Sequence, residues 1–255
     1  MKKSSPIALI IPIHYEQNNV IQLLKNISSK IKIPIVLYFI YDDDKDPSLK
    51  VISENIKNYN FKTKIIKNKL GTGALNAIKT GLINFHEEAC IITMADGSDD
   101  LSSINEMYGL FCKGFHIICA SRYMRNGRQN GGSIIKKTLS YMAGKSLYYL
   151  TSLPTHDATN NFKLYSKKII DQISIESQGG FEIGIEILSK AHVLNFAITE
   201  VPTIWNDRNE GASKFKLWKW LPHYLKWYFY LILKKPFFVK IKSPIYNSIK
   251  TVGNN

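Results

Sequence analysis

The sequence predicts an α/β fold in which helices cover both faces of a mostly parallel β-sheet. Apolar runs with the length of buried strands alternate with segments of helical periodicity between residues 7 and 121, and parallel strands buried on both faces need such continuous runs. Acidic clusters follow two of these runs, and ligands of parallel sheets bind at the carboxyl ends of the strands. A chain of 255 residues is long enough for one large domain with an appendage.

The expected strands are short runs dominated by Ile, Val, Phe and Tyr. They are 7–13 (IALIIPI), 34–41 (PIVLYFIY), 62–67 (KTKIIK), 89–95 (ACIITMA) and 115–121 (FHIICAS). Helical segments are expected at 16–31, 74–85 and 101–111. In the first of these, apolar residues recur at helical spacing and define one buried face, as at Val20, Leu23 and Ile27.

The positive charge is concentrated near the end of the chain. The formal net charge is +14, and after Glu210 there is no Asp or Glu but there are nine lysines. This shift divides the chain into a domain at 1–212 and a basic, aromatic-rich region at 213–255. Within its aromatic part the longest charge-free segment, 227–233, is too short to cross a bilayer of about 30 Å. Amphipathic helices on an anionic membrane surface are expected there, and a helix docked on the domain or on a partner subunit is the alternative.

Charge and cysteine content separate several classes of protein. A basic chain can bind nucleic acid, but lysines interleaved with aromatic residues favour a membrane surface, so no nucleic-acid partner is expected. The chain has an odd number of cysteines and no CxxC motif. This indicates that Cys90, Cys112 and Cys119 are reduced thiols in a cytosolic environment. The first apolar stretch, PIALIIPI (6–13), is interpreted as a strand rather than a signal peptide because it is short and contains two prolines.

Three carboxylates follow the fourth expected strand in the segment MADGSDD (94–100), namely Asp96, Asp99 and Asp100. Closely spaced acids repel one another and resist burial unless a cation joins them. A turn followed by a helix N-cap also uses Asp and Ser. A second acidic segment, YDDD (41–44), ends at the same edge of the predicted sheet. Two clusters at one edge favour a divalent metal site over a turn.

The strand ends, taken in order, resemble the dolichol-phosphate mannose synthase-like glycosyltransferases, which are inverting GT-A fold enzymes of glycosyltransferase family two. The resemblance extends over about residues 6–230. It is carried by IPIHYE (11–16), YDDD (41–44), LGTGALNAIKTG (70–81), MADGSDD (94–100), ASRY (120–123), TNNFKLYSKK (159–168) and VPTIWNDRNEGASKFKLW (201–218). It implies a GT-A, Rossmann-like sheet and a nucleotide-sugar donor, a UDP- or GDP-hexose, while the sugar, the base and the acceptor stay open.

The resemblance implies that the first three strand ends bind the nucleotide. Pro12, His14 and Glu16 match the opening motif, with His at the usual aromatic position. Asp42 and Asp43 match an acidic pair that accepts hydrogen bonds from a base edge. The third element is the glycine loop that contains Gly71, because backbone N–H groups in such a loop can approach a ligand closely.

The resemblance also implies a metal cofactor, Mg²⁺ or Mn²⁺, since both prefer hard oxygen ligands. Asp96 matches the first residue of the family's Asp-x-Asp motif, Ser98 replaces the second, and Asp100 matches a further oxygen ligand. Such an ion bridges the donor diphosphate, so Asp96 is expected to act in catalysis and in nucleotide binding. Because Ser98 departs from the motif, a degenerate, non-catalytic domain is an alternative.

The acceptor side is expected to hold a lipid phosphate. Arg122, Lys136, Ser140 and Arg208 resemble the family's residues for this phosphate, with Lys214 as a further candidate. Arginine can hold a phosphate bidentately, so Arg122 is also expected to act in catalysis. A phosphate nucleophile is mostly ionised at neutral pH, with a second pKa of about 6, and needs no strong general base.

Two glutamates in FEIGIEIL, Glu182 and Glu186, lie one helical turn apart. If the acceptor is a sugar hydroxyl, one of them is the candidate general base, and Glu186 is taken as a candidate catalytic residue. The alternative is that Glu186 pairs with a basic residue and orders the acceptor loop.

These observations predict an enzyme that moves one hexose, with inversion, from a nucleotide sugar to a polyprenyl phosphate of the dolichyl or undecaprenyl type. It is expected to lie peripherally at the cytoplasmic face of a membrane, and a membrane-spanning partner subunit is left open. One alternative is a family-two transferase that extends a cell-surface glycan on a sugar hydroxyl. Another is a non-catalytic basic protein that binds membranes or nucleic acid. A sugar nucleotidyltransferase is disfavoured because the first strand end lacks that class's basic, Gly-rich loop.

Overall fold

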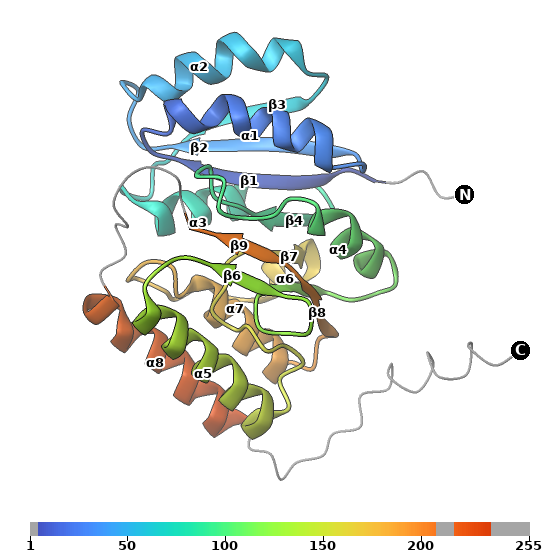
Figure 1. The fold of residues 1–255 in the computed structure, drawn as a ribbon, viewed down its shortest axis with the longest axis vertical. Helices are drawn as coiled ribbons and strands as arrows, with labels where there is room; N and C mark the ends of the chain where they lie inside the picture. Colours follow the sequence, from blue (N-terminus) through green and yellow to red (C-terminus); the bar gives the residue numbers. More distant parts are fainter. Residues whose placement is uncertain (1–4, 208–216, 236–255) are drawn as a thin grey trace, which may run out of the picture.

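The computed structural model describes residues 5–207 and 217–235 and contains a seven-stranded, mostly parallel sheet in the order β3-β2-β1-β4-β7-β5-β8 (Figure 1). Only β7 is antiparallel to its neighbours within this sheet. The strands are β1 (Ile7–Ile13), β2 (Ile35–Tyr41), β3 (Lys62–Lys67), β4 (Ala89–Ile92), β5 (Ile117–Ser121), β7 (Lys163–Ser166) and β8 (Ile198–Pro202). The predicted fold class and all five predicted strands are confirmed.

Helices cover both faces of the sheet because successive residues of each strand point to opposite sides. They are α1 (Gln17–Lys30), α2 (Pro47–Asn55), α3 (Ala74–Asn84), α4 (Ser103–Cys112), α5 (Ile134–Thr151), α6 (Lys167–Gln172), α7 (Ile183–Val193) and α8 (Leu217–Lys234), with a 3₁₀ turn at Ile56–Asn58. In β1, Ile7, Leu9 and Ile11 pack into one core with α1, α2 and α4. Ala8 and Ile10 pack into a second core with α3 and α7.

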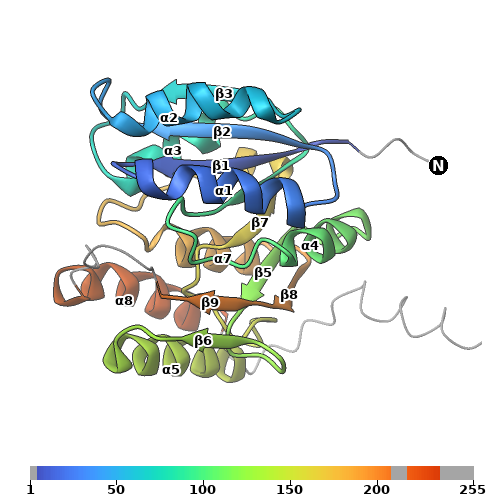
Figure 2. The ribbon, with the colours of Figure 1, turned by 45° about the horizontal axis from the view of Figure 1, so that its top comes forward.

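Two strands of the main sheet were not predicted. Strand β7 has only four residues, and it lies between β4 and β5 although it follows them in the chain. Strand β8 pairs in parallel with β5. A separate two-stranded sheet joins β6 (Arg128–Asn130) to β9 (Ile204–Asn206), and Figure 2 shows it between the main sheet and α5. These short segments have no periodicity of their own, so their pairing depends on tertiary contacts.

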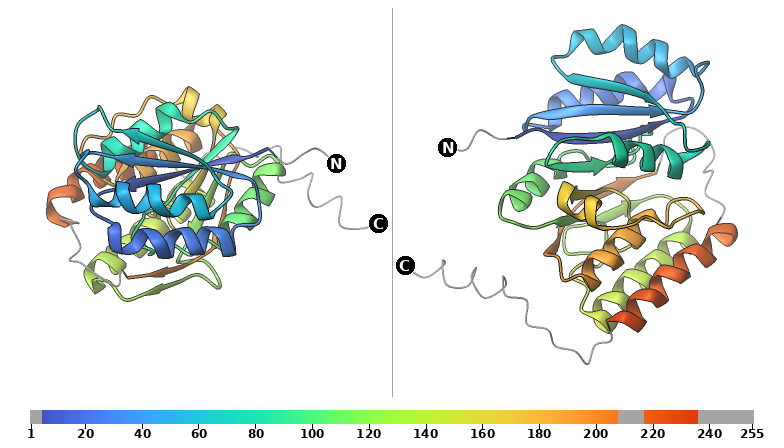
Figure 3. Two further views of the ribbon diagram at one scale, coloured as in Figure 1. Left: turned by 90° about the horizontal axis from the view of Figure 1, so that it is seen from above. Right: turned by 180° about the vertical axis from the view of Figure 1, so that it is seen from behind.

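Helix α8 packs on the domain, which is the alternative considered for the tail. It lies beside α5 and α7 at the end of the molecule opposite β3 (Figure 3). Trp227 and Leu231 are buried in the core that α7 shares, and the Tyr228 hydroxyl donates to Ser146 Oγ on α5 at 2.9 Å. Among the described residues, no helix has the length and apolarity needed to cross a membrane. The division at residue 212 lies outside the described residues and stays a prediction.

The packing of α8 predicts opposite effects for two tryptophans. Trp227 is 2% exposed and has the Nζ atoms of Lys190 and Lys226 over its ring at 4.7 and 4.6 Å, whereas Trp218 is 75% exposed. We expect Trp227→Ala to lower the free energy of unfolding by about 3–5 kcal/mol. Trp218→Ala, the matched control, should change it by less than about 0.5 kcal/mol. Urea unfolding measures both, and equal small effects would contradict a docked α8.

Candidate active site

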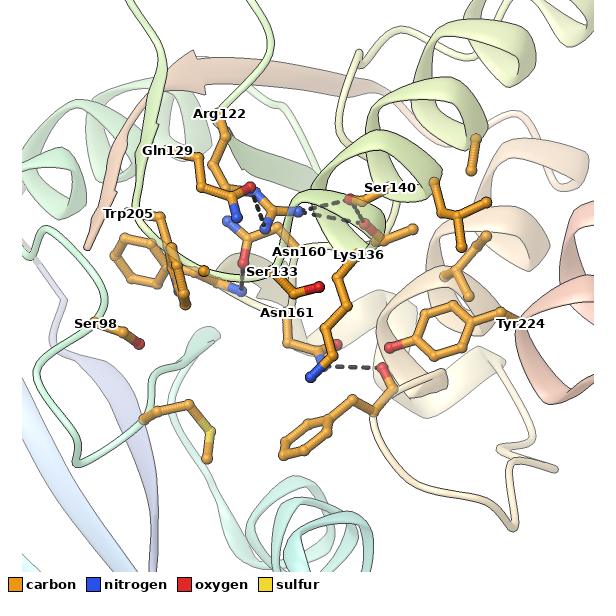
Figure 4. A pocket seen from close by; sticks show the side chains of 18 of the residues that line it. Ser98, Arg122, Gln129, Ser133, Lys136, Ser140, Asn160, Asn161, Trp205 and Tyr224 are labelled. Atoms are coloured by element: carbon orange, nitrogen blue, oxygen red, sulfur yellow. Dashed lines mark hydrogen bonds between the residues drawn. The ribbon is translucent and has the colours of Figure 1, made fainter. Parts of the chain in front are cut away.

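A pocket of about 630 Å³ lies beyond the carboxyl ends of β4 and β5 and is closed by β9, α5 and α8. Its polar wall comes from the loop after β4, from β5 and from the start of α5, and includes Asp96, Asp99, Arg122 and Lys136. Its apolar wall comes from α5 and α8 and includes Leu139, Met142, Ala143, Leu221 and Leu225. Charged groups and an apolar wall therefore share one cavity, and Figure 4 views the polar side chains from close by.

The loop after β4 brings two carboxylates into the pocket. Asp96 Oδ1 accepts a hydrogen bond from the backbone N–H of Ser98 at 3.1 Å. Asp99 Oδ2 accepts from Thr93 Oγ1 at 2.9 Å and from Met94 N at 3.2 Å. Burial of the Asp99 carboxyl, followed by repulsion from Asp96, raises its pKa to about 7. Asp96, Ser98 and Asp99 offer oxygen donors on one side of the pocket, and hard oxygen donors of this kind fit a divalent ion.

Asp100 has other partners, and these contacts argue against its predicted role as a metal ligand. Its Oδ1 accepts from Lys30 Nζ at 3.1 Å, and Ser102 donates to the same carboxylate from its backbone N–H and its hydroxyl. Asp100 is absent from the pocket lining, whereas Asp99 is present. Within the described residues, no three His, Cys, Asp or Glu side chains form a group that could hold a metal by themselves. An ion at Asp96 and Asp99 therefore has to complete its shell with Ser98, water or a bound ligand.

Apart from Asp96, the predicted nucleotide residues gather at the carboxyl ends of β1, β2 and β3, outside the pocket lining. Asp42 accepts from Asn68 Nδ2 at 2.8 Å and from the backbone N–H of Gly73 at 2.7 Å. Gly71 and Gly73 have φ values of +107° and +106°, a region that L side chains rarely adopt. Asp42 thus holds the glycine loop that contains Gly71 against the end of β2.

The opening motif forms a second part of this region. His14 is exposed, and its ring meets Tyr15 edge to face at 5.1 Å. The hydroxyl of Tyr15 donates to Asp43 at 3.3 Å. The backbone of Tyr15 has a φ of +57°, and its N–H donates to Asp46 at 2.8 Å, which stabilises this conformation. Tyr15, which the sequence analysis missed, therefore adds a second exposed ring beside His14 and Asp43.

Two residues of the opening motif have local structural partners. Pro12 is buried within β1. The Glu16 carboxylate accepts from Asn19 Nδ2 at 2.6 Å, and its backbone N–H donates to Ser48 at 2.7 Å. These contacts fasten the turn between β1 and α1 to α2.

Arg122 reaches the pocket from the end of β5 as one half of a buried ion pair. Its Nε donates to Asp157 Oδ2 at 2.7 Å, and its Nη2 donates to Asp157 Oδ1 at 2.9 Å and to Ser140 Oγ at 3.0 Å. Burial acts to raise the pKa of Asp157, but Arg122 holds it below its usual range. Lys136 extends from α5 into the same pocket (Figure 4). The structure thus brings together three of the four predicted acceptor residues, and Arg208, like Lys214, lies outside the described residues.

Glu182 and Glu186 are fully buried at the start of α7 and are absent from the pocket lining. Glu186 accepts from the backbone N–H groups of Glu176 and Ser177 at 2.6 and 2.8 Å and from Lys190 Nζ at 2.8 Å. The oxygens of Glu182 accept from the N–H groups at positions 179 and 180. Every carboxylate oxygen is engaged, so both glutamates order the loop before α7. For Glu186 this geometry supports the structural alternative over the predicted catalytic role.

The sequence analysis missed Trp205, which lines the pocket, and Asp157, which pairs with the pocket residue Arg122. Trp205 on β9 pairs with Gln129 on β6 and forms a β-bridge with Asp99. Its indole lines the pocket beside Gln129 and Arg122, on the side toward Ser98 (Figure 4). The sequence could not predict this position, because a single aromatic residue in a three-residue strand belongs to no periodic pattern or motif. Asp157 lies in a loop, and its pairing with Arg122 spans 35 residues.

Comparison with known proteins identifies relatives of the same class. The profile of Glycosyl transferase family 2 matches residues 8–174. The uncharacterised glycosyltransferase YkcC of Bacillus subtilis is 24% identical over 225 residues, which cover 87% of this chain and 67% of that protein. A dolichyl-phosphate beta-glucosyltransferase of Dictyostelium discoideum is 24% identical over 231 residues, covering 79% of this chain and 66% of the relative. The chain thus spans about two thirds of the length of these relatives.

Solved structures show the same fold. Glucosyl-3-phosphoglycerate synthase from Mycobacterium tuberculosis in complex with UDP superposes with a TM-score of 0.64 at 11% identity, covering 95% of this chain and 85% of that one. The mannosyltransferase PcManGT from Pyrobaculum calidifontis, in complex with GDP-Man and Mn²⁺, gives 0.65 at 12% identity, covering 95% and 67%. With a family profile that matches more than half of the sequence and a sheet of this architecture around the acidic pocket, the chain belongs to glycosyl transferase family 2 and is a glycosyltransferase.

Proposed function

We propose that this glycosyltransferase moves a hexose from a UDP- or GDP-hexose to a polyprenyl phosphate, with inversion, while it lies peripherally at the cytoplasmic face of a membrane. The observation that carries the proposal is the composition of the pocket. Its acidic loop, its Arg122 and Lys136 cations and the apolar side chains of α5 and α8 line one continuous cavity. This combination suits a reaction between a metal-bound diphosphate and a phosphate that carries an apolar chain.

On the donor side, Asp96 and Asp99 would hold Mg²⁺ or Mn²⁺ together with the diphosphate. When bound, the ion would neutralise the charge that develops as the nucleotide leaves. The base would lie at the ends of β1 and β2, where His14 and Tyr15 offer exposed rings and Asp43 an acceptor. The Mn²⁺ and nucleotide complexes of structures with this fold support the assignment.

On the acceptor side, Lys136 and the Arg122 guanidinium would bind the phosphate. One of its oxygens forms a bond to C1 of the hexose while the bond from C1 to the donor diphosphate breaks on the opposite face, which inverts C1. The nucleophile is already ionised at neutral pH, with a second pKa of about 6, so no proton has to be removed. The engaged oxygens of Glu182 and Glu186 are consistent with chemistry that uses no carboxylate base.

The outer surfaces of α5 and α8 support a membrane location. Neither helix contains Asp or Glu. Both carry large exposed apolar side chains beside the pocket, among them Ile135, Met142, Leu225 and Phe229. A surface of this kind suits the interface of an anionic leaflet. Incubation with UDP- and GDP-hexoses, Mn²⁺ and either undecaprenyl phosphate or an oligosaccharide, followed by mass spectrometry, tests the proposal. If the hexose is added to the oligosaccharide and not to undecaprenyl phosphate, the glycan-extending alternative replaces the proposed function.

Two aspartates of the acidic loop should differ in their effect on nucleotide binding. We expect Asp96→Asn to abolish the Mn²⁺-dependent rise in melting temperature with UDP or GDP, because a metal-bridged nucleotide stabilises the fold by mass action. Asp100→Asn, the matched control, should leave that rise unchanged and cost about 1 kcal/mol of stability or less, because the ion pair with Lys30 is partly exposed and the asparagine oxygen can still accept a hydrogen bond from Ser102. Loss of the nucleotide response in Asp100→Asn would return Asp100 to the metal site.

The acceptor cations should matter more to transfer than Glu186. Lys136→Gln removes a charge-assisted contact worth roughly 1.5–3 kcal/mol and should lower kcat/KM for polyprenyl phosphate about ten- to a hundredfold, with nucleotide affinity unchanged. Lys145→Gln, on the same helix but outside the pocket lining, is the control and should have little effect. Glu186→Gln should chiefly lower stability. If Glu186→Gln instead slows the chemical step by about 10²–10⁴-fold with intact stability, the acceptor is a hydroxyl and the base is Glu186.

Trp205 should contribute to binding of the hexose, because its indole lies between the acidic loop and Arg122. We expect Trp205→Ala to weaken binding of UDP-glucose or GDP-mannose, whichever the protein binds, by about three- to tenfold while the affinity for the free nucleotide is kept. Trp205→Phe should retain most of the sugar-dependent affinity, and Trp218→Ala should behave as wild type. Calorimetric titration in Mn²⁺ measures both affinities. An equal loss for nucleotide and nucleotide sugar would assign Trp205 a purely structural role.

A further inference from the structure

A second cavity shares a wall with the active-site pocket. It has a volume of about 770 Å³, and Arg122 and Gln129 line both cavities. The rest of its lining comes from the turn after β5, from β6 and from the first half of α5. None of the residues assigned above to the donor or to the metal lines it. The reaction proposed above therefore leaves this second cavity without a ligand.

The second cavity has an excess of positive charge. Arg128 and Lys137 line it, and its described lining contains no Asp or Glu. The Arg128 side chain makes no ion pair or hydrogen bond with the described residues, and Lys137 Nζ has a 3.4 Å contact to the carbonyl oxygen of Gln129. Arg122 is already paired with Asp157, so Arg128 and Lys137 supply the uncompensated charge. An anion is the ligand chemistry that fits.

The rim of the second cavity is apolar and aromatic. Tyr123 and Tyr141 meet edge to face at 5.4 Å, and the Arg122 guanidinium carbon lies 4.9 Å from the centre of the Tyr123 ring. Ile134, which is 80% exposed, lines the cavity at the start of α5. A free phosphate would leave these apolar groups without a partner, whereas an anion with an attached hydrocarbon chain would contact them.

The geometry of α5 connects this rim to the surface that faces the proposed membrane. Ile134, Lys137 and Tyr141 recur at i, i+3 and i+7 and share one face of the helix. Ile135 and Met142, which are 59% and 60% exposed, form the adjacent stripe. A ligand whose phosphate sits at Lys137 could therefore extend its hydrocarbon along exposed apolar side chains without leaving the surface of α5.

We propose that the second cavity binds the phosphate headgroup of an anionic phospholipid that is not a substrate, with its acyl chains along the exposed stripe of α5. The inference rests on the membrane location proposed above and adds to it a specific lipid site beside the acceptor pocket. Arg122 and Gln129 form the wall that the two cavities share. A headgroup bound in the second cavity would therefore hold the active-site pocket at the depth in the membrane at which the phosphate of a polyprenyl phosphate lies.

The test compares two variants of the full chain with equal loss of charge. Arg128→Gln/Lys137→Gln removes both uncompensated cations of the cavity. Lys25→Gln/Lys57→Gln removes two exposed lysines from the opposite end of the molecule. The probes are phosphatidylcholine vesicles with and without phosphatidylglycerol, monomeric dioctanoyl phosphatidylglycerol, and inorganic phosphate. Sedimentation measures vesicle binding, and calorimetry measures the soluble probes.

We expect Arg128→Gln/Lys137→Gln to weaken binding to phosphatidylglycerol vesicles by about ten- to thirtyfold, because each cation near an anionic surface contributes roughly fivefold. The control should lose about threefold or less. Dioctanoyl phosphatidylglycerol should saturate the wild-type protein and not the cavity variant, and inorganic phosphate should bind much more weakly than the lipid. Nucleotide affinity and transfer to a short-chain acceptor in detergent should be unchanged in both variants.

Three results would overturn the inference, and each is distinct from failure of the hexose transfer proposed above. Equal losses in the two variants would indicate diffuse attraction between charges. Inorganic phosphate that binds as tightly as the lipid would indicate a simple anion site. Absence of vesicle binding together with a dimer in sedimentation velocity would indicate that α5 contacts a second copy of the chain. In all three cases nucleotide binding and hexose transfer are measured separately, so they report on the transferase reaction itself.

Discussion

The buried ion pair between Arg122 and Asp157 is the interaction on which the active-site pocket depends. Two Arg122 nitrogens hold the two carboxylate oxygens at 2.7 and 2.9 Å, and the same guanidinium reaches Ser140 on α5. The pair therefore ties the end of β5 to the loop before β7 and to α5. Removing one partner of a buried pair strands the other charge, at a cost of about 3–5 kcal/mol. Arg122 thus acts as a structural residue and as part of the pocket wall.

In the acidic loop after β4, by contrast with the Arg122–Asp157 pair, the Asp99 carboxylate has no ion-pair partner among the described residues. Its burial and the nearby Asp96 raise the pKa of Asp99 to about 7, although Arg122 acts in the opposite direction. The pocket therefore has a negative end that calls for a cation and a positive end that suits a phosphate. Trp205 lies between the two ends because its strand pairs with β6 and bridges to Asp99. This polarity gives donor and acceptor separate places in one cavity.

Helices α5 and α8 pack against the core on one side and also expose large apolar side chains on the other side. On one side α8 contributes Trp227 and Leu231 to the core, and α5 contributes Leu147. On the other side both helices expose large apolar side chains and lysines without any acidic residue. Apolar groups left in water reduce solubility, and an adjoining apolar phase removes that cost. The proposed membrane contact and the proposed phospholipid site both follow from this one surface.

The sequence by itself determined most of the main-sheet strands, several helices and the order of the strand ends. Runs such as 7–13 and 34–41 predict buried strands because their apolar side chains have no polar face, and periodicity predicts α1, α3 and α4. The order of the strand ends predicts the family, and the structure finds Asp96, Arg122, Lys136 and Ser140 lining one pocket. The predicted strands and the predicted family are confirmed because each depends on residues that are neighbours along the chain or on the order of parallel strands.

Tertiary structure decided which partner each charged side chain finds. Asp100 pairs with Lys30 across 70 residues, Asp157 pairs with Arg122 across 35, and Glu186 binds the loop before α7. Strand β7 enters the sheet between two strands that precede it, although its four residues carry no periodic signal. A carboxylate accepts equally well from a metal, a lysine or a backbone N–H, so its residue type leaves the choice open. The fold makes that choice, because it determines which donor lies within hydrogen-bonding distance once the chain has packed.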